Sequence, residues 1–485
     1  MGGTLRRRPA RRTASRGVAI GAVVLSFGLI AAACGDDSSG SAATTAAAAA
    51  TTAAGAATTG AATDGSTTTV SIDPTTLTNG QGVTDDTITI GVTMDQSGPF
   101  AILSGGIKGG FDAKIAHIND TGGVLGRQIK IIYYDDKSDP AQVLQNFKRL
   151  WEQDKVFGIY VANIVGPPLD YVAQKNVATT LLGGPPAVFS SKYPTIFPTG
   201  SITPAWNAQA DYAVVNVLGM KPKVVAVSYL PYEEPVLGFI EDAWKKLGAE
   251  TVIMDPWPGG PADPCDAFVL KYKDANVDYW DMHATNFLSC IPAEIKAGWS
   301  PPMGQGGPST SSLDLSTFIG KPMADLGVIA GAPTTQADGS PVHTSPTPAT
   351  EEYVDAMNKY APDFAKSHDL NDWVPQLAYM GGTWFADGIL GSAQLTGGIS
   401  PEGLVQWAQT VKDWDPGLAE PVKSMAPDCK TGNDSTVWGK WTWDEASQRL
   451  KMVPFAPAPG EPMVNNDWLG VDECYLTQMA DEFFS

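Results

Sequence analysis

The chain has 485 residues, enough for two domains with their own cores, and a formal net charge of −20 at pH 7. With 52 acidic against 32 basic residues, its composition argues against nucleic acid or anionic lipid as a partner. No Cys-x-x-Cys pair occurs and the four histidines are far apart, so we expect neither a metal nor a cofactor.

The first 34 residues are typical of a secretory leader. Six arginines precede an apolar run from Val18 to Ala33, which is too short and too rich in small residues for a membrane span. The end of this run resembles a bacterial lipobox, with Ala31 where Leu or Val is usual. We therefore predict a signal peptide at 1–33 and a lipidated Cys34. The alternative is cleavage near Ala33 that leaves an ordinary cysteine.

Residues 34–84 form a low-complexity segment of Ala, Thr, Gly and Ser. Such a composition buries too little apolar surface to offset chain entropy, so we predict a disordered tether. Because the leader holds six of the 32 basic residues and no acidic one, the chain from Cys34 onward has 26 basic and 52 acidic residues, a formal charge of −26. This acidity suits a secreted, soluble protein and says nothing specific about a ligand.

The folded part begins with a strand–helix–strand–helix pattern between Thr87 and Trp151. Apolar residues alternate from Ile88 to Val92, recur at helical spacing from Ile107 to Ile118, and form a second strand at 129–134. Asp139 and Pro140 suit the N-cap and first position of the next helix. This order is the start of a parallel α/β sheet, in which ligands bind at the carboxyl ends of the strands.

Short motifs in this stretch resemble the opening of the leucine/isoleucine/valine-binding family of ABC-importer receptors. They are 91–92 (Gly-Val), 97–99 (Ser-Gly-Pro), 118–119 (Ile-Asn), 122–123 (Gly-Gly), 135–136 (Asp-Asp) and 138–140 (Ser-Asp-Pro). The resemblance continues more weakly to about residue 425. It implies an α/β, type I periplasmic-binding-protein fold: two doubly wound parallel-sheet lobes, joined by a multi-strand hinge around a ligand cleft.

The alternation of strands and helices continues along the chain. We expect strands at 156–161, 178–182, 224–229, 251–254, 279–283 and 328–330, with helices at 169–175, 236–247, 291–298, 351–359, 376–395 and 403–410, and another beginning at Cys265. The tail from Val437 to Ser485 is expected to be β-rich. We assign lobe I to 85–203 and 332–436, and lobe II to 204–331 and 437–485, with hinge crossings near 202–204, near 331–335 and in the tail.

Four cysteines remain after Cys34, an even number that suggests two disulfides outside the cytoplasm. Of three possible connectivities, Cys265–Cys290 and Cys429–Cys474 are favoured because each pair closes a local unit. The alternative is four buried thiols.

Loops at the strand ends supply the candidate ligand residues. Each of these residues is equally compatible with a turn or cap, but their occurrence at six matching strand ends favours a binding role. They are Ser97, Leu103, Ala162, Asn163, Gly183, Gly184, Tyr232, Thr285, Asn286 and Ser309. Free amides at the helix start after Asp95 are expected to attract an anion, and His283 is a further candidate.

These loops differ from the amino-acid-binding members that the chain resembles. In those members, hydroxyl residues hold the ligand carboxylate, and an acidic residue in the loop matching Gln305 to Ser312 holds the ammonium. Here the first loop has Ala162 and Asn163, and 305–312 contains no acid. Unpaired charges in a closed site are costly, so a branched-chain amino acid is disfavoured unless Glu233 or Asp281 replaces the missing acid.

No motif of a catalytic nucleophile, zinc protease or nucleotide-binding loop occurs, so the chain is not expected to be an enzyme. We predict an extracytoplasmic receptor, lipid-anchored to the outer face of the bacterial cytoplasmic membrane. As a monomer, it would deliver a small organic molecule (amino acid, amide, aromatic or other carboxylate-type solute) to ABC permease subunits. The alternatives are a sensor that signals through a partner and, less favoured, a secreted hydrolase.

Overall fold

A computed structural model of the protein describes residues 72–163, 165–201, 203–257, 264–283, 287–305, 316–317, 319–332, 347–368, 370–432, 437–457, 461 and 465–484. The chain divides into two compact units, Met1–Thr68 and Thr69–Ser485, and all described residues belong to the second. The predicted signal peptide and Cys34 lie outside the described residues. Within the described ranges, no helix has both the length and the apolar character needed to cross a membrane.

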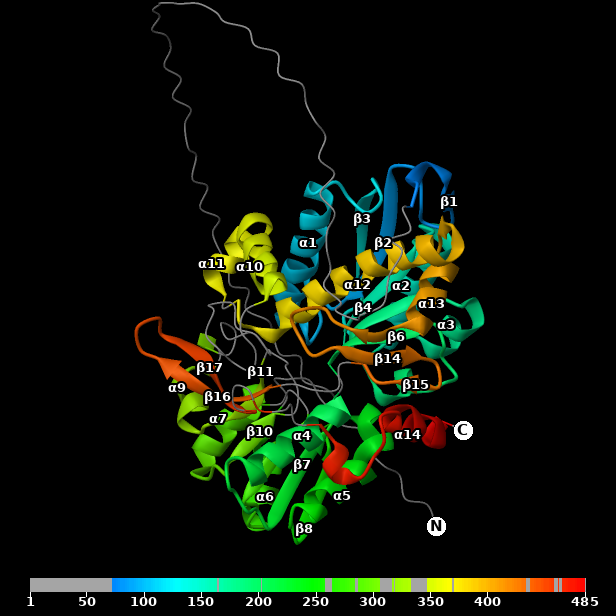
Figure 1. Ribbon diagram of the computed structural model, residues 1–485. Helices are drawn as coiled ribbons and strands as arrows, with labels where there is room; N and C mark the ends of the chain where they lie inside the picture. Colours follow the sequence, from blue (N-terminus) through cyan, green and yellow to red (C-terminus); the bar gives the residue numbers. More distant parts are fainter. Residues whose placement is uncertain are drawn as a thin grey trace, which may run out of the picture. The chain divides into compact units, whose positions relative to one another are not determined.

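The first half of the folded unit is built on a five-stranded parallel sheet in the order β3-β2-β4-β5-β6 (Figure 1). Its strands are β2 (Thr87–Met94), β3 (Gln128–Asp135), β4 (Gly158–Ala162), β5 (Thr179–Gly183) and β6 (Ile196–Ser201). The alternating residues of β2 pack against α1 (Ser104–Asp120), whereas Leu150 packs over Gly91 on the other face. Burial on both faces explains the near-continuous apolar character of the central strands.

Helices cover both faces of this sheet, and α2 (Pro140–Lys148) begins at the N-cap that the sequence predicts. Asp139 caps α2 by accepting bonds from Ala141 N and Gln142 N, as predicted. The remaining helices of this half are α3 (Leu169–Lys175), α10 (Pro348–Tyr360), α11 (Pro362–Ser367), α12 (Trp373–Thr396) and α13 (Pro401–Thr410). α1 and α12 lie side by side, and Gly110 of α1 lies directly against the Pro375 carbonyl of α12.

Strand β6 was missed by the sequence analysis because its residues suit a strand poorly. It contains Pro198 and Gly200, which lack a ladder donor and a side chain, respectively. The strand lies at the edge of the sheet, where a proline is tolerated. A Cβ atom at position 200 would lie 1.5 Å from the Leu182 carbonyl oxygen, so the close approach of β5 requires glycine there.

The second half is a seven-stranded sheet in the order β17-β16-β11-β10-β9-β7-β8. The parallel strands are β7 (Val224–Tyr229), β8 (Thr251–Pro256), β9 (Tyr279–Met282), β10 (Met303–Gln305) and β11 (Ile329–Ala332), and the antiparallel pair is β16 (Val437–Asp444) and β17 (Arg449–Ala456). Its helices are α4 (Thr203–Asn216), α5 (Leu237–Lys246), α6 (Asp266–Asp274), α7 (Phe287–Ala297) and α9 (Lys321–Asp325). The parallel five-stranded sheet and the mainly parallel seven-stranded sheet confirm the predicted α/β fold class, whereas the lobe boundaries stay predictions.

Other segments also differ from the sequence-based expectation. The tail is not β-rich throughout, because it ends in the helix α14 (Tyr475–Phe484). A small sheet of β13 (Lys412–Trp414), β14 (Val422–Ala426) and β15 (Cys429–Lys430) was not predicted. Residues 72–84 of the predicted tether are hydrogen-bonded: β1 (Thr78–Asn79) pairs with β12 (Gly398–Ile399), and Arg127 donates to the Thr84 carbonyl.

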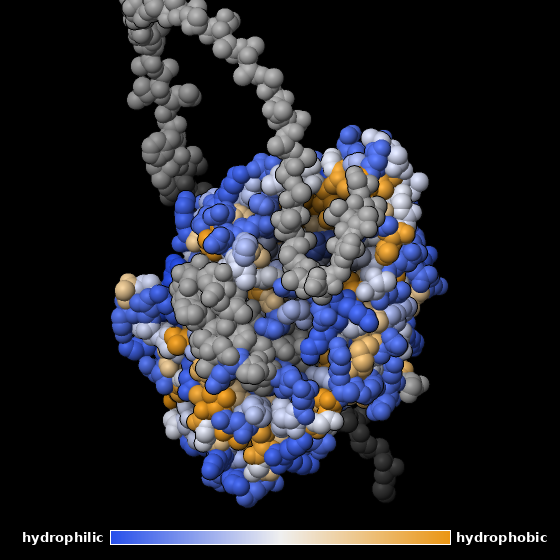
Figure 2. Space-filling view, in the orientation of Figure 1, coloured by the Kyte–Doolittle hydropathy of each residue, from blue (hydrophilic) through white to orange (hydrophobic). Residues whose placement is uncertain are grey.

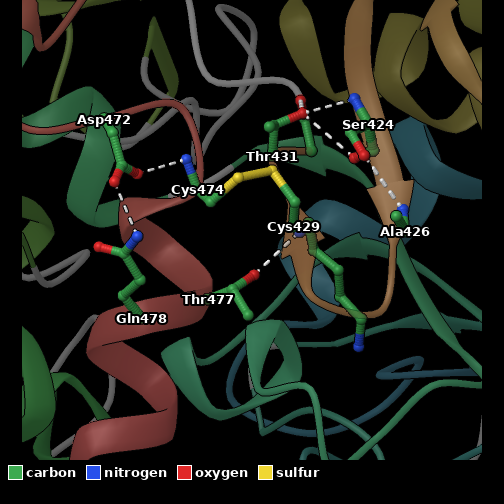
Figure 3. Close-up of a disulfide and its surroundings, with 10 residues drawn as sticks. Ser424, Ala426, Cys429, Thr431, Asp472, Cys474, Thr477 and Gln478 are labelled. Atoms are coloured by element: carbon green, nitrogen blue, oxygen red, sulfur yellow. Dashed lines mark hydrogen bonds between the residues drawn. A yellow bond between two sulfur atoms is a disulfide. The ribbon is translucent and has the colours of Figure 1, made fainter.

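Both predicted disulfides are confirmed. Cys265 is joined to Cys290 between α6 and α7, and Cys429 is joined to Cys474. Figure 3 shows the second bond connecting β15 to the start of α14, where Thr477 also accepts a bond from the Lys430 backbone. Hydrophilic residues cover most of the described surface on the face in Figure 2, and hydrophobic residues occur there in small groups.

Candidate ligand-binding site

The loops after β2, β3 and β4 meet at the carboxyl ends of these strands. Ser97 Oγ donates to Asp135 Oδ2 over 2.5 Å, and Asn163 Nδ2 donates to Asp136 Oδ2 over 2.6 Å. The structure therefore brings two predicted ligand residues together with the aspartate pair at the end of β3. Burial raises the pKa of Asp136, although bonds from Asn163, Ser138 and Thr93 act in the opposite direction.

The turn that leads into α1 is held together by hydrogen bonds to the side chain of Asp95, a residue of the same turn. The Asp95 carboxylate is buried and accepts bonds from Gly98 N at 2.5 Å and Phe100 N at 2.9 Å. These amides are among those that the sequence offered as an anion site, and here they are already satisfied. The missed signal is the aspartate three residues before Gly98, a spacing typical of a side chain that bonds its own turn.

The other predicted residues of this half occupy varied positions. Ala162 is buried at the end of β4, whereas Gly183 and Gly184 are half-buried at and just after the end of β5. Leu103 is half-buried in the 3-10 turn before α1. The half-buried glycines keep backbone groups near the surface at the carboxyl end of β5.

In the seven-stranded sheet, the loop after β7 forms the 3-10 helix η5 (Pro231–Val236), in which Tyr232 is half-buried. Its neighbour Glu233 is fully buried, and Glu233 Oε2 accepts a bond from Leu230 N over 2.8 Å. The other predicted residues of this half, Thr285, Asn286 and Ser309, lie outside the described residues.

A buried charged cluster lies where η5 meets the end of β9. His283, which follows β9, places Nε2 3.1 Å from Asp281 Oδ2 and Nδ1 3.6 Å from Glu233 Oε1. Trp244 Nε1 donates to the same Asp281 oxygen over 3.1 Å. Asp211 of α4 interacts electrostatically with Asp281, and both of its carboxylate oxygens lack a hydrogen-bond partner among the described residues. We call Asp211, Glu233, Asp281 and His283 the buried cluster.

The proton positions in the buried cluster follow from its charges. Burial alone lowers the pKa of His283, but the charges of Asp281 and Glu233 raise it to about 10, so the ring is an imidazolium at neutral pH. Burial and the charge of Asp281 raise the pKa of Asp211 well above its usual range. Glu233 and Asp281, the two acids considered as replacements for a missing ammonium ligand, both face His283.

A cavity of about 700 Å³ lies elsewhere, beside the disulfide Cys429–Cys474. Strands β13 and β14 line one part of it with Lys412 and Lys423, and the segment before α14 contributes Asp467, Asp472 and Glu473. None of the ten predicted ligand residues is among its lining residues.

Comparison with known proteins decides the family. Residues 87–438, more than two thirds of the chain, match the family model described as "Periplasmic binding protein". The chain belongs to this family. The match confirms the resemblance read from the first strand–helix–strand unit.

Sequence relatives and solved structures are both similar to this periplasmic binding protein. The Leu/Ile/Val-binding protein of Escherichia coli K12 is 24% identical over 367 residues, covering 74% of this chain and 87% of that protein. A fatty acid ABC transporter substrate-binding protein from Thermomonospora curvata has a TM-score of 0.66 at 20% identity, covering 83% of this chain and 98% of that one. A Rhodopseudomonas palustris BisB5 solute-binding protein in complex with 3,4-dihydroxybenzoic acid has a TM-score of 0.60 at 18% identity, covering 80% and 100%. These structures establish the fold.

The buried cluster is the feature of this binding protein that the sequence analysis did not assemble. Glu233, Asp281 and His283 were each noticed as separate candidates near the strand ends. Their pairing depends on the adjacency of β7 and β9, with Asp211 added from α4. Strand adjacency is a tertiary property, so no spacing in the sequence signals it.

Proposed function

We propose that this periplasmic binding protein captures a small organic solute between loops of its two sheets and delivers it to the permease of an ABC importer. Its family membership and the loops at the carboxyl ends of two parallel sheets support this role. Ligand binding would select a closed arrangement stabilised by contacts with both sets of loops. The protein would act as a monomer without catalysis.

The proposed solute class depends on one observation: Glu233 and Asp281 both contact His283. A solute ammonium needs a carboxylate that it can reach, and the side chains of Glu233 and Asp281 are at most 2% exposed and turned toward His283. We therefore propose an organic acid or amide with an apolar body in preference to an α-amino acid. The solved relatives with 4-hydroxybenzoate and 3,4-dihydroxybenzoic acid agree with this class, whereas the Leu/Ile/Val-binding relatives favour the opposite one.

A thermal-shift screen against aromatic acids, fatty acids, amides and the branched-chain amino acids tests the proposal. A true solute at 100 times its Kd stabilises the folded state by about 2.7 kcal/mol. We expect an acid or amide to raise Tm and leucine to leave it unchanged. A shift with leucine alone would show that the solute class is wrong.

Import is favoured over sensing, and a measurement of cellular uptake distinguishes the two functions. Deleting the gene should abolish cellular uptake of the solute that the screen identifies. Unchanged uptake would favour the second candidate function, a receptor that signals through a partner.

We further propose that Cys34 carries the lipid anchor and that the segment after it tethers the folded unit to the outer face of the membrane. The apolar run that ends at Ala33 supports this assignment. Cys34→Ala should release the protein from the membrane fraction. An unchanged membrane fraction would exclude lipidation at this residue.

A further inference from the structure

The C-terminal segment 465–484, which we call the strap, contacts both halves of the folded unit. Toward the second half, Tyr475 stacks on Phe239 of α5 with the ring centroids 5.4 Å apart. The ring centroids of Trp468 and Tyr212 of α4 are 5.3 Å apart. The strap therefore packs on two helices of the seven-stranded sheet.

Hydrogen bonds of α14 connect the same segment to the first half. Asp481 Oδ1 accepts bonds from Ser190 Oγ over 2.6 Å and from Ser191 N over 2.8 Å, and both serines lie between β5 and β6. Thr477 Oγ1 accepts a bond from Lys430 N of β15 over 2.9 Å. The strap thus connects the five-stranded sheet to the seven-stranded sheet.

A disulfide adds a covalent bond to these contacts. It joins Cys474, at the start of α14, to Cys429 of β15 (Figure 3). The next residue, Lys430, donates three hydrogen bonds to carbonyls within residues 188–193, so β15 is itself bound to the first half. Stacked rings and single hydrogen bonds separate when packed elements slide, whereas the S–S bond keeps the strap on β15.

We infer that the strap limits the movement of the two halves relative to each other, and that a small thiol releases this restraint by opening the disulfide Cys429–Cys474. The inference goes beyond solute capture, because the restraint exists whether or not a solute is bound.

Access for a thiol differs between the two disulfides. Cys429 lines the cavity of about 700 Å³, and both Cys429 and Cys474 are half-buried. Cys265 and Cys290 are each 0% exposed. Because exchange requires a thiolate to reach a disulfide sulfur, the bond of the strap should react first.

The exchange proceeds in two steps. A thiolate in the cavity attacks Cys429 Sγ, forms a mixed disulfide there and displaces the Cys474 thiolate, which takes a proton from water. A second thiolate attacks the outer sulfur of the mixed disulfide and displaces the Cys429 thiolate, which is protonated in turn. Two molecules of the small thiol are oxidised to their disulfide, and the protein disulfide is reduced by two electrons.

Alkylation during mild reduction tests the access of the thiol. The full chain is treated with 2-mercaptoethanol, quenched at intervals with iodoacetamide and mapped by mass spectrometry. We expect Cys429 and Cys474 to be alkylated about tenfold faster than Cys265 and Cys290. Equal rates, or earlier alkylation of Cys265 and Cys290, would overturn the inference.

Hydrogen exchange tests whether the disulfide holds the strap. In the unaltered protein, 2-mercaptoethanol should speed exchange of the α14 amides about tenfold and leave the β2 amides unchanged. The double substitution Cys429→Ser with Cys474→Ser is the matched control. It should show the fast α14 rates from the start and no response to the thiol. Unchanged α14 rates after reduction would show that the disulfide does not hold the strap.

Pulsed electron spin resonance measures the movement of the halves. Spin labels on non-natural amino acids at the exposed positions of Gln174 in α3 and Glu250 before β8 report the distance between the halves. Reduction should broaden the distribution of this distance, and the double substitution should show the broad distribution before any thiol is added. An unchanged distribution after the α14 rates have risen would overturn the inference. None of the three measurements uses a solute, so their results are independent of the screen that tests the proposed function.

Discussion

Lys430 Nζ lies 2.6 Å from the Tyr193 carbonyl oxygen, although the two residues are 237 positions apart in the chain. The same ammonium donates to the Val188 and Ser190 carbonyls, at 3.1 Å each, and is fully buried. It thus connects β15 to the turn after β5, close to the Cys429–Cys474 disulfide. Burial lowers the pKa of Lys430 to about 7, whereas the three carbonyls favour the charged form because they accept all three of its protons.

Replacing Lys430 with methionine should destabilise the protein by about 3 kcal/mol. The apolar side chain fills a similar volume but removes three hydrogen bonds, and the Ser190 and Tyr193 carbonyls keep only their backbone donors, Tyr193 N and Ile196 N. Lys412→Met, at an exposed site on the neighbouring sheet strand β13, should cost less than about 0.5 kcal/mol. Urea unfolding of both variants at pH 7.5 measures the difference, and equal midpoints would contradict the structural role of Lys430.

The contribution of His283 to the stability of the protein should be lost at alkaline pH. Its pKa in the folded state is about 10, against an ordinary value of 6.5, so the folded protein binds the proton more tightly. The stabilisation is complete below pH 6.5 and is lost as the pH rises to 10. It should amount to roughly 2–4 kcal/mol for such a coupled buried group.

Unfolding free energies at several pH values measure this slope. In His283→Gln the slope between pH 6.5 and 10 should be smaller than in the unaltered protein, and His117→Gln should keep it. Parallel curves for the unaltered protein and His283→Gln would exclude a shifted pKa at this histidine.

Glu294 of α7 should be a source of instability at neutral pH. Its side chain is fully buried, both carboxylate oxygens lack a hydrogen-bond partner among the described residues, and burial raises the pKa of Glu294 to about 9. An acid with a raised pKa destabilises the folded state progressively as the pH rises from 4.5 to 9. Glu294→Met should therefore stabilise the protein by about 1–3 kcal/mol at pH 7.5.

The pH dependence supplies the control for this variant. The gain from Glu294→Met should shrink as the pH falls through 4.5, because below this pH the carboxyl is protonated in both the folded and unfolded states. A variant that is less stable than the unaltered protein at pH 7.5 would indicate that Glu294 has a favourable partner.

Two glycines of α1 should respond oppositely to alanine. A Cβ atom at Gly110 would lie 2.0 Å from the Pro375 carbonyl oxygen, so Gly110→Ala must push α1 away from α12 and should cost about 1–3 kcal/mol. At Gly105 the nearest atom is 3.9 Å away, and alanine should gain up to about 1 kcal/mol from helix propensity. Thermal unfolding of the two variants shows whether each substitution raises or lowers Tm. A stabilising Gly110→Ala would contradict the close packing of the two helices.

Local patterns in the sequence were sufficient for most of the fold. The alternation of β2, the Asp139 cap of α2 and the spacing of the cysteines involve residues close together in the chain. Each depends on side-chain period, turn chemistry or short loop closure. The family followed from the same local motifs.

The tertiary structure decided what depends on strand order and on contacts between distant residues. Edge strand β6 forms despite Pro198 because no described strand pairs with its outer side. His283 meets Glu233 because β7 and β9 are neighbours, and Lys430 meets three carbonyls because β15 folds back on the turn after β5. Such pairs carry no periodic signal, since their separation in sequence is set by the path of the chain and not by the chemistry of the contact.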